Sequence, residues 1–139
     1  MTTIAYKDRK IASDCGITSY NHVADGFMRK FVNKNGVFAL AAGNVSVVSH
    51  FLDWFKDGCK GIYHNKGDDA DLMIITPDGK AVIFAGTYMS LSKCDCIAIG
   101  SGAQIAIGAM YAGASALEAV KIARKVDAHT FGPIITDSH

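Results

Sequence analysis

Three pairs of short apolar segments, each pair separated by a turn sequence, are the feature that most restricts how this chain folds. The clearest turn contains Asn35-Gly36, and Asn-Gly is a strong hairpin signal because both residues tolerate positive φ. Pro77-Asp78-Gly79 marks a second turn, since Pro presets one backbone angle and Gly accepts the left-handed conformation. The predicted pairs are residues 30–32 with 37–42 around the turn 33–36, 72–76 with 81–85 around 77–79, and 4–6 with 11–13 around 7–10.

Helical signals lie between these hairpins and after them. Asn44 is a suitable N-cap for a helix whose apolar residues recur at helical spacing, namely Val47, Val48, Phe51, Leu52 and Phe55. An apolar strand over residues 94–99 leads through Gly100-Ser101-Gly102 into a helix of small residues over 103–112.

A last helix and a short strand close the predicted order of elements. Ser115 and Glu118 form a capping box for this helix. Its predicted apolar face consists of Ala116, Ala119, Val120, Ala123 and Val126. The final strand is expected around residues 133–136. Hairpins with helices in two blocks favour an α+β fold in which two antiparallel sheets pack face to face with the helices outside.

Composition and charge exclude several classes of function. The 139 residues are expected to form a single domain, 1–139, and 50% hydrophobic residues with a net charge of +1 are typical of a soluble globular protein. Neither a basic excess for nucleic acid, nor an apolar run long enough for a membrane span, nor a signal sequence is present, so we expect a cytoplasmic protein. The cysteines are expected to be free thiols, without a metal or another cofactor, at positions 15, 59, 94 and 96.

Two other kinds of function can be considered from local motifs. Gly100-Ser101-Gly102 lies between a strand and a helix, as a dinucleotide-binding loop would, but position 105, where a third glycine is needed, is Ile105. Cys15 lies beside a glycine and would be the nucleophile of a cysteine hydrolase with His22 or His50, although no signature of such an enzyme surrounds it.

Several motifs, in consistent order along the chain, resemble those of one family. The opening Thr2-Thr3-Ile4-Ala5-Tyr6-Lys7-Asp8, followed by Ile11-Ala12-Ser13-Asp14, resembles the start of bacterial and archaeal proteasome β subunits and of the peptidase HslV. Further matching segments are Met28-Arg29-Lys30-Phe31, Ala42-Gly43, Ile97-Ala98-Ile99-Gly100-Ser101-Gly102, Ser115-Ala116-Leu117-Glu118-Ala119-Val120 and residues 127–132.

This resemblance implies the four-layer αββα sandwich of N-terminal nucleophile hydrolases. Arg9 stands where the family commonly has Gly. A short polar connector, residues 58–71, replaces the family's second helix, and the chain stops before the family's last strands. We therefore expect a shortened version of the fold.

The resemblance also implies threonine-type peptide hydrolysis. A threonine hydroxyl needs a nearby base, and an N-terminal threonine carries one in its free α-amine, with a reference pKa of about 7.7–8.0. Thr2 would be this nucleophile once Met1 is removed. Lys30 would supply a positive charge held by Asp14, and Gly43 would donate its N–H to the oxyanion. Ser101, Asp127 and Thr130 would support the Thr2 amine.

Substrate and partners follow from the same resemblance. The substrate pocket would be lined by Ile17, Met28, Val32, Ala41, Val45 and Ser49, which predicts cleavage after apolar residues. An extended peptide would pair with the backbone near Thr18 and Gly43. The implied partners are peptide or unfolded protein substrates, further copies of the chain in a homo-oligomer, and an unfolding ATPase. The alternative is a non-catalytic subunit with the same fold and a role in assembly or interaction.

Overall fold

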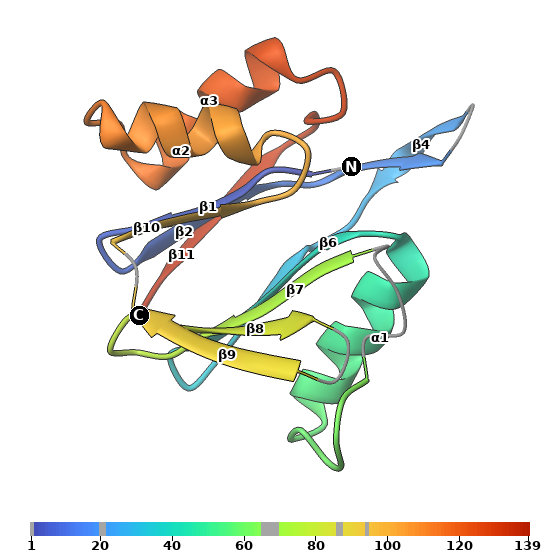
Figure 1. Cartoon of the computed structure of the whole chain (residues 1–139). Helices are drawn as coiled ribbons and strands as arrows, with labels where there is room; N and C mark the ends of the chain where they lie inside the picture. The colour runs from blue at the N-terminus through green and yellow to red at the C-terminus, as the bar shows by residue number, and fades with distance from the viewer. Residues whose placement is uncertain (1, 20–21, 65–69, 86–87, 94) are drawn as a thin grey trace.

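Two antiparallel sheets pack face to face, with helices on both outer sides (Figure 1). The structure, a computed structural model, describes residues 2–19, 22–64, 70–85, 88–93 and 95–139, and gives the backbone alone for residues 18, 19, 22–26, 85 and 88–92. The four-stranded sheet has the order β10 (Cys96–Ile99), β1 (Ile4–Lys7), β2 (Lys10–Asp14) and β11 (Ile134–Ser138). The five-stranded sheet has the order β5 (Phe31–Lys34), β6 (Val37–Gly43), β7 (Ala70–Ile75), β8 (Lys80–Ala85) and β9 (Tyr88–Lys93).

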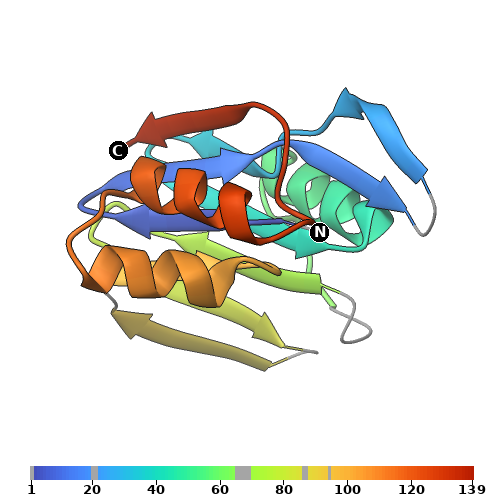
Figure 2. The same ribbon diagram turned by 90° about the horizontal axis from the view of Figure 1, so that it is seen from above.

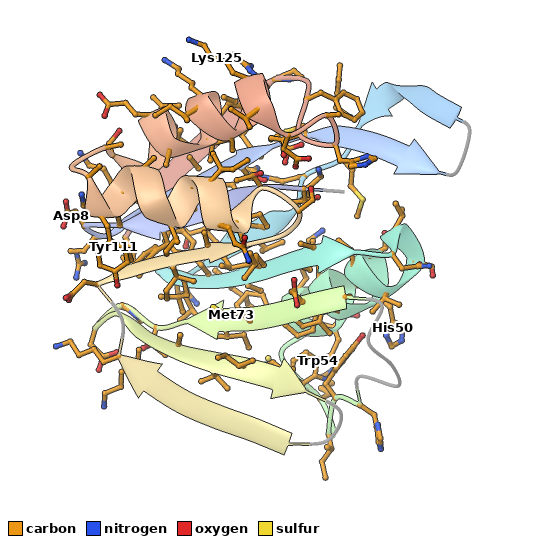
Figure 3. The ribbon with its side chains drawn as sticks, turned by 45° about the horizontal axis from the view of Figure 1, so that its top comes forward. Asp8, His50, Trp54, Met73, Tyr111 and Lys125 are labelled. Atoms are coloured by element: carbon orange, nitrogen blue, oxygen red, sulfur yellow. The ribbon has the colours of Figure 1, made fainter. Side chains whose placement is uncertain are left out.

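The helices form the two outer layers. Helices α2 (Ala103–Tyr111) and α3 (Ala116–Val126) lie side by side over the four-stranded sheet (Figure 2), whereas α1 (Val45–Lys56) covers the five-stranded sheet. Figure 3 shows Lys125 on the outer side of α3, and His50 and Trp54 beside α1 in the opposite layer. The expected αββα arrangement is therefore confirmed.

Alternation along the strands creates a separate core between each pair of layers. In β6, Phe38 and Leu40 belong to the core between the sheets, whereas Ala39 and Ala41 pack beneath α1. A third core joins small residues of β1 and β2 to α2 and α3, including the buried Met110. Because successive strand residues face opposite sides, nearly continuous apolar strands are needed in a four-layer fold.

The helix caps agree with the sequence signals. The Asn44 side chain accepts a hydrogen bond from the backbone N–H of Ser46 at the start of α1. Ser115 and Glu118 form a complete capping box at the start of α3. Val126, however, is 67% exposed, so its assignment to the apolar face of the last helix was wrong. It is the last residue of α3, beyond the part of the helix that packs on the sheet.

The three predicted hairpins are confirmed as β1–β2, β5–β6 and β7–β8. Lys30 precedes β5 instead of lying within it. The strand predicted from residue 94 begins at Cys96, and Cys94 lies outside the described residues. Residues 58–64 of the predicted connector contain no helix or strand and 70–71 belong to β7, while 65–69 lie outside the described residues.

Three strands are additional to the sequence-based expectations. One is the edge strand β9, and the other two, β3 (Gly16–Ser19) and β4 (His22–Phe27), form a separate hairpin. This hairpin extends from the same end of the sandwich at which the N-terminus lies, whereas the C-terminus lies at the opposite end (Figure 1).

Candidate active site

The strand register brings four segments to the N-terminal end of the sandwich. Ile4 pairs with Ile99 on one side and with Ser13 on the other, so Thr3 and Thr2 continue between the ends of β10 and β2. Asp14 pairs with Ile134, which places the loop between α3 and β11 beside the same end. The residues predicted for catalysis therefore converge although they are separated along the chain.

Asp14 and Lys30 form a buried ion pair at this end. The Lys30 ammonium donates to Asp14 Oδ2 at 3.1 Å, and their side chains are 5% and 0% exposed. Asp14 also accepts hydrogen bonds from the backbone N–H groups of Thr3 at 2.9 Å and Phe131 at 3.2 Å. Burial lowers the pKa of Lys30, and the charge of Asp14 and its hydrogen bond oppose that shift. Asp14 thus holds a lysine whose charge is easier to remove than usual.

A second carboxylate organises the hydroxyl groups around the start of the chain. Asp127 Oδ2 accepts from the Ser101 hydroxyl at 2.5 Å and from the Thr130 hydroxyl at 2.6 Å. Ser101 Oγ in turn accepts from the backbone nitrogen of Thr2 at 3.3 Å. Burial opposes the ionisation of Asp127, but these hydroxyl donors outweigh it and lower the pKa of the carboxyl. An ionised Asp127 is therefore linked through Ser101 to the nitrogen of Thr2.

A pocket at this end contains Thr2, Lys30 and Gly43 together. Its remaining lining residues are Gly16, Ile17, Met28, Ala41, Val45 and Val48. Four of the residues predicted to bind substrate are therefore in the lining, whereas Val32 and Ser49 lie outside it. The backbone of Thr18 lies in β3, and its side chain is outside the described part. Gly16 and Val48 were not predicted to line the pocket. Val48, however, belongs to the predicted apolar face of the helix that follows Asn44.

Gly43 ends β6 with φ of 126°, a conformation that favours glycine. Any side chain here would be strained and would also narrow the pocket. This conformation explains the glycine at the end of a strand that lines the pocket.

The Gly100-Ser101-Gly102 motif has a structural explanation in the path of the N-terminal segment. A Cβ at Gly100 would overlap the carbonyl oxygen of Thr2, and one at Gly102 would overlap the Thr3 hydroxyl. The N–H of Gly102 donates to the Thr2 carbonyl at 3.3 Å. The space that a dinucleotide phosphate would need is therefore filled by the chain itself.

This close approach predicts a large effect of Gly100→Ala. Gly100 has φ of 99°, so alanine would add backbone strain of about 1–3 kcal/mol to the overlap with Thr2. We expect a fall of at least about 2 kcal/mol in the free energy of unfolding. Gly108→Ala is the matched control, because no atom outside its chain neighbours and the backbone of its own helix lies within 4 Å of a Cβ at this position in α2, and it is expected to be neutral or stabilising. Equal denaturant midpoints for both variants would contradict this explanation.

The geometry does not favour Cys15 as a nucleophile. Its side chain is 5% exposed, and burial raises the pKa of its thiol, which disfavours the reactive thiolate. The His50 ring contacts the Tyr63 hydroxyl at 3.3 Å, and the side chain of His22 lies outside the described part.

Among the described residues, no group of His, Cys, Asp or Glu could hold a metal ion. No helix in the described ranges has both the length and the hydropathy of a membrane span.

Comparisons with known proteins identify the fold. No family model and no curated protein matches the sequence of this chain. The chain nevertheless has the fold of HslV and proteasome-like structures. HslV from Trypanosoma brucei superimposes with a TM-score of 0.71 at 17% identity, covering 99% of both chains.

BPH from Thiobacillus denitrificans gives a TM-score of 0.68 at 19% identity, covering 99% of this chain and 96% of that one. The same protein in complex with epoxomicin gives 0.66 at 18% identity, covering 99% and 97%.

Proposed function

We propose that this chain is a threonine-type endopeptidase of the proteasome and HslV class, which cleaves after apolar residues with Thr2 as its nucleophile once Met1 is removed. The observation that carries the proposal is the pocket that Thr2 shares with Lys30 and Gly43. The fold shared with HslV and BPH supports it.

The reaction follows from the chemistry of an N-terminal threonine. The Thr2 hydroxyl oxygen attacks the carbonyl carbon of the scissile bond, and its proton passes to the Thr2 α-amine. The tetrahedral intermediate collapses, the carbon–nitrogen bond breaks, and the leaving amine takes up that proton. Water, deprotonated by the same amine, then attacks the acyl carbon of the Thr2 ester. The bond between that carbon and Thr2 Oγ breaks, the protonated amine returns its proton to Thr2 Oγ, and the acid product leaves.

Each neighbouring residue has a role in this sequence. The Lys30 ammonium, kept in place by Asp14, lowers the proton affinity of the Thr2 site. The Gly43 N–H stabilises the developing oxyanion, an interaction of about 2.7–4 kcal/mol in comparable sites. Ser101, Asp127 and Thr130 orient the amine through the hydrogen bonds described above.

Substrate preference follows from the pocket wall. Ile17, Met28, Ala41, Val45 and Val48 offer apolar surface, so a substrate side chain that fills the pocket gains from leaving water. The main chain of an extended peptide would pair with the backbone near Thr18 and Gly43.

Assembly and location are part of the same proposal. We propose a cytoplasmic homo-oligomer that receives unfolded substrates from an ATPase. Light scattering of the purified protein tests the assembly, and a monomeric mass at micromolar concentration would contradict it.

Hydrolysis of fluorogenic peptides tests the proposed activity. Peptides with Leu or Ala before the reporter should be cleaved, and matched peptides with Asp or Lys there should be cleaved much more slowly. The control is the same chain with an uncleavable N-terminal extension, which blocks the amine and is expected to be inactive. Because BPH is known in complex with epoxomicin, this inhibitor should abolish the activity. A protein that retains Met1, folds and ignores these peptides is the result expected for a non-catalytic subunit.

The pH dependence provides a further prediction. The Thr2 amine acts as a base only when it is neutral, so kcat/KM should fall about tenfold per pH unit below the pKa of the amine. Lys30 disfavours a second positive charge in the pocket and so lowers the pKa of the amine, whereas the Asp127 carboxylate beyond Ser101 favours the protonated amine and opposes that shift. On the alkaline side, activity should fall as Lys30 loses its proton and its charge. Because burial lowers the pKa of Lys30, this fall should begin at a lower pH than it would for an ordinary lysine. A kcat/KM that stays constant from about pH 5 to 7 would exclude the amine as the base.

A further inference from the structure

Thr3 connects the two carboxylates of the site, although the proposed mechanism gives it no task. Its backbone N–H donates to Asp14 Oδ1 at 2.9 Å, and its hydroxyl lies 2.6 Å from the Thr130 hydroxyl. Thr3 is fully buried and Thr130 is 1% exposed. Buried hydroxyls require partners, so this contact is part of a built network.

The direction of the hydrogen bonds is fixed by the number of protons. Thr130 has one hydroxyl proton and donates it to Asp127 Oδ2 at 2.6 Å. The proton between the two threonines must therefore come from Thr3. The result is a chain in which Thr3 donates to Thr130, Thr130 donates to Asp127, and Ser101 donates to the same carboxylate oxygen.

The network surrounds the segment that carries the nucleophile. Ser101 accepts from the Thr2 nitrogen, and the N–H of Gly102 donates to the Thr2 carbonyl. A Cβ at Gly102 would overlap the Thr3 hydroxyl, so the glycine leaves room for that group. Thr2 is thus held at its nitrogen by Ser101 and at its carbonyl by Gly102, and Thr3, the next residue of the same segment, is held by Asp14 and Thr130.

We propose that Thr3 is a positioning residue, which ties the segment bearing Thr2 to Asp127 through its hydroxyl and to Asp14 through its N–H. The inference rests on the proposed function, because it concerns the placement of the Thr2 amine and hydroxyl beside Lys30. Among the described residues, the charged or titratable groups at this end of the sandwich include Asp127, Lys30, Asp14, His129, Cys15 and Arg29.

Thr3→Val tests the hydroxyl, because valine has nearly the same shape and lacks only the donor. We expect kcat to fall about 10- to 100-fold, the loss typical of a misplaced reacting group. KM should change less than about threefold, because the pocket wall is untouched. Thr3→Ser retains the hydroxyl and should restore most of kcat. Methionine removal depends on residue 2, so both variants should be processed alike, which mass spectrometry verifies.

A double-mutant cycle separates the hydrogen-bond chain from general packing. Thr130→Val removes the next hydroxyl in the chain, so Thr3→Val/Thr130→Val should lose no more kcat than the single variants. Additive losses, or a Thr3→Ser variant as slow as Thr3→Val, would overturn the proposal. If thermal unfolding shows that Thr3→Val does not fold, Thr130→Val and Thr3→Ser still provide the comparison. A low kcat in Thr130→Val together with a nearly unchanged kcat in Thr3→Ser supports the role of the hydrogen-bond chain. Any other order of the two kcat values overturns it.

Titration of the Thr2 amine by NMR gives a readout that does not require peptidase activity. The protein is prepared with a leader that is cleaved to expose Thr2. Without the donor from Thr3, Thr130 becomes a weaker donor to Asp127, whose charge then favours the protonated amine. Thr3→Val should therefore raise the pKa of the amine, and Thr3→Ser should not. An unshifted amine overturns the role of Thr3, whereas a shifted amine in a protein that cleaves no peptide overturns only the proposed function.

Discussion

Replacement of Thr2 by Ala is expected to lower kcat/KM for apolar peptides by at least about 1,000-fold, equivalent to about 4 kcal/mol of transition-state stabilisation. Alanine keeps the α-amine and is small enough for Met1 removal, so only the attacking oxygen is lost. Thr2→Ser keeps both groups and should retain much of the activity. Steady-state hydrolysis of a fluorogenic peptide measures both variants.

The paired variants of residue 2 also exclude a contaminating protease. Activity that persists unchanged in Thr2→Ala would contradict the assignment of the nucleophile. Equal loss in Thr2→Ala and Thr2→Ser would point to a disturbed N-terminal segment instead. Thermal unfolding of the three proteins distinguishes these cases.

Asp14→Asn is expected to reduce the free energy of unfolding by about 3–5 kcal/mol, because it leaves a buried ammonium without its counter-charge. The carboxylate accepts from Lys30 and from the N–H groups of Thr3 and Phe131, and an amide cannot serve all three donors. Such a loss is a large part of the roughly 5–15 kcal/mol that stabilises a typical domain. Denaturant unfolding monitored by circular dichroism measures it.

Two control variants make the Asp14 experiment specific. Asp53 forms an exposed pair with Lys56 at 3.9 Å, so Asp53→Asn should change stability by less than about 0.5 kcal/mol. Lys30→Met leaves Asp14 with its two backbone donors and should be less destabilising than Asp14→Asn, yet it should remove peptidase activity. Similar stability losses in Asp14→Asn and Asp53→Asn would show that the buried pair has no structural role.

Local signals predicted most of the fold. Asn35-Gly36 and Pro77-Asp78-Gly79 mark turns by backbone geometry, and the Ser115 capping box marks a helix start by hydrogen bonding, so neither depends on distant contacts. The β3–β4 hairpin was missed because residues 20–21, between its strands, are not a typical turn sequence and β4 contains Asp25-Gly26, a pair with low strand propensity. Strand β9 has the alternation Met89, Ser90, Leu91, Ser92, a period of two that is typical of a strand but too short to be decisive beside the stronger hairpin signals.

The site required tertiary information. The resemblance indicated Thr2, Asp14 and Lys30, and the structure brings them to one end of the sandwich. Nothing in the sequence shows that Thr3 meets Thr130, because this contact depends on the register of β1 with β2 and on the loop before β11. Val48 was missed for a related reason, since a residue on the buried face of α1 can serve both the core and the pocket.

The chemical state of residue 2 tests the central claim most directly. The intact mass of the purified protein should correspond to the chain without Met1. After incubation with a peptide epoxyketone, which reacts with the hydroxyl and free amine of an N-terminal threonine, the mass should increase by that of one inhibitor molecule. The Thr2→Ala variant should also lose Met1, but its mass should not increase after incubation with the inhibitor. A folded protein that retains Met1, or that loses Met1 and remains unlabelled, would contradict the account.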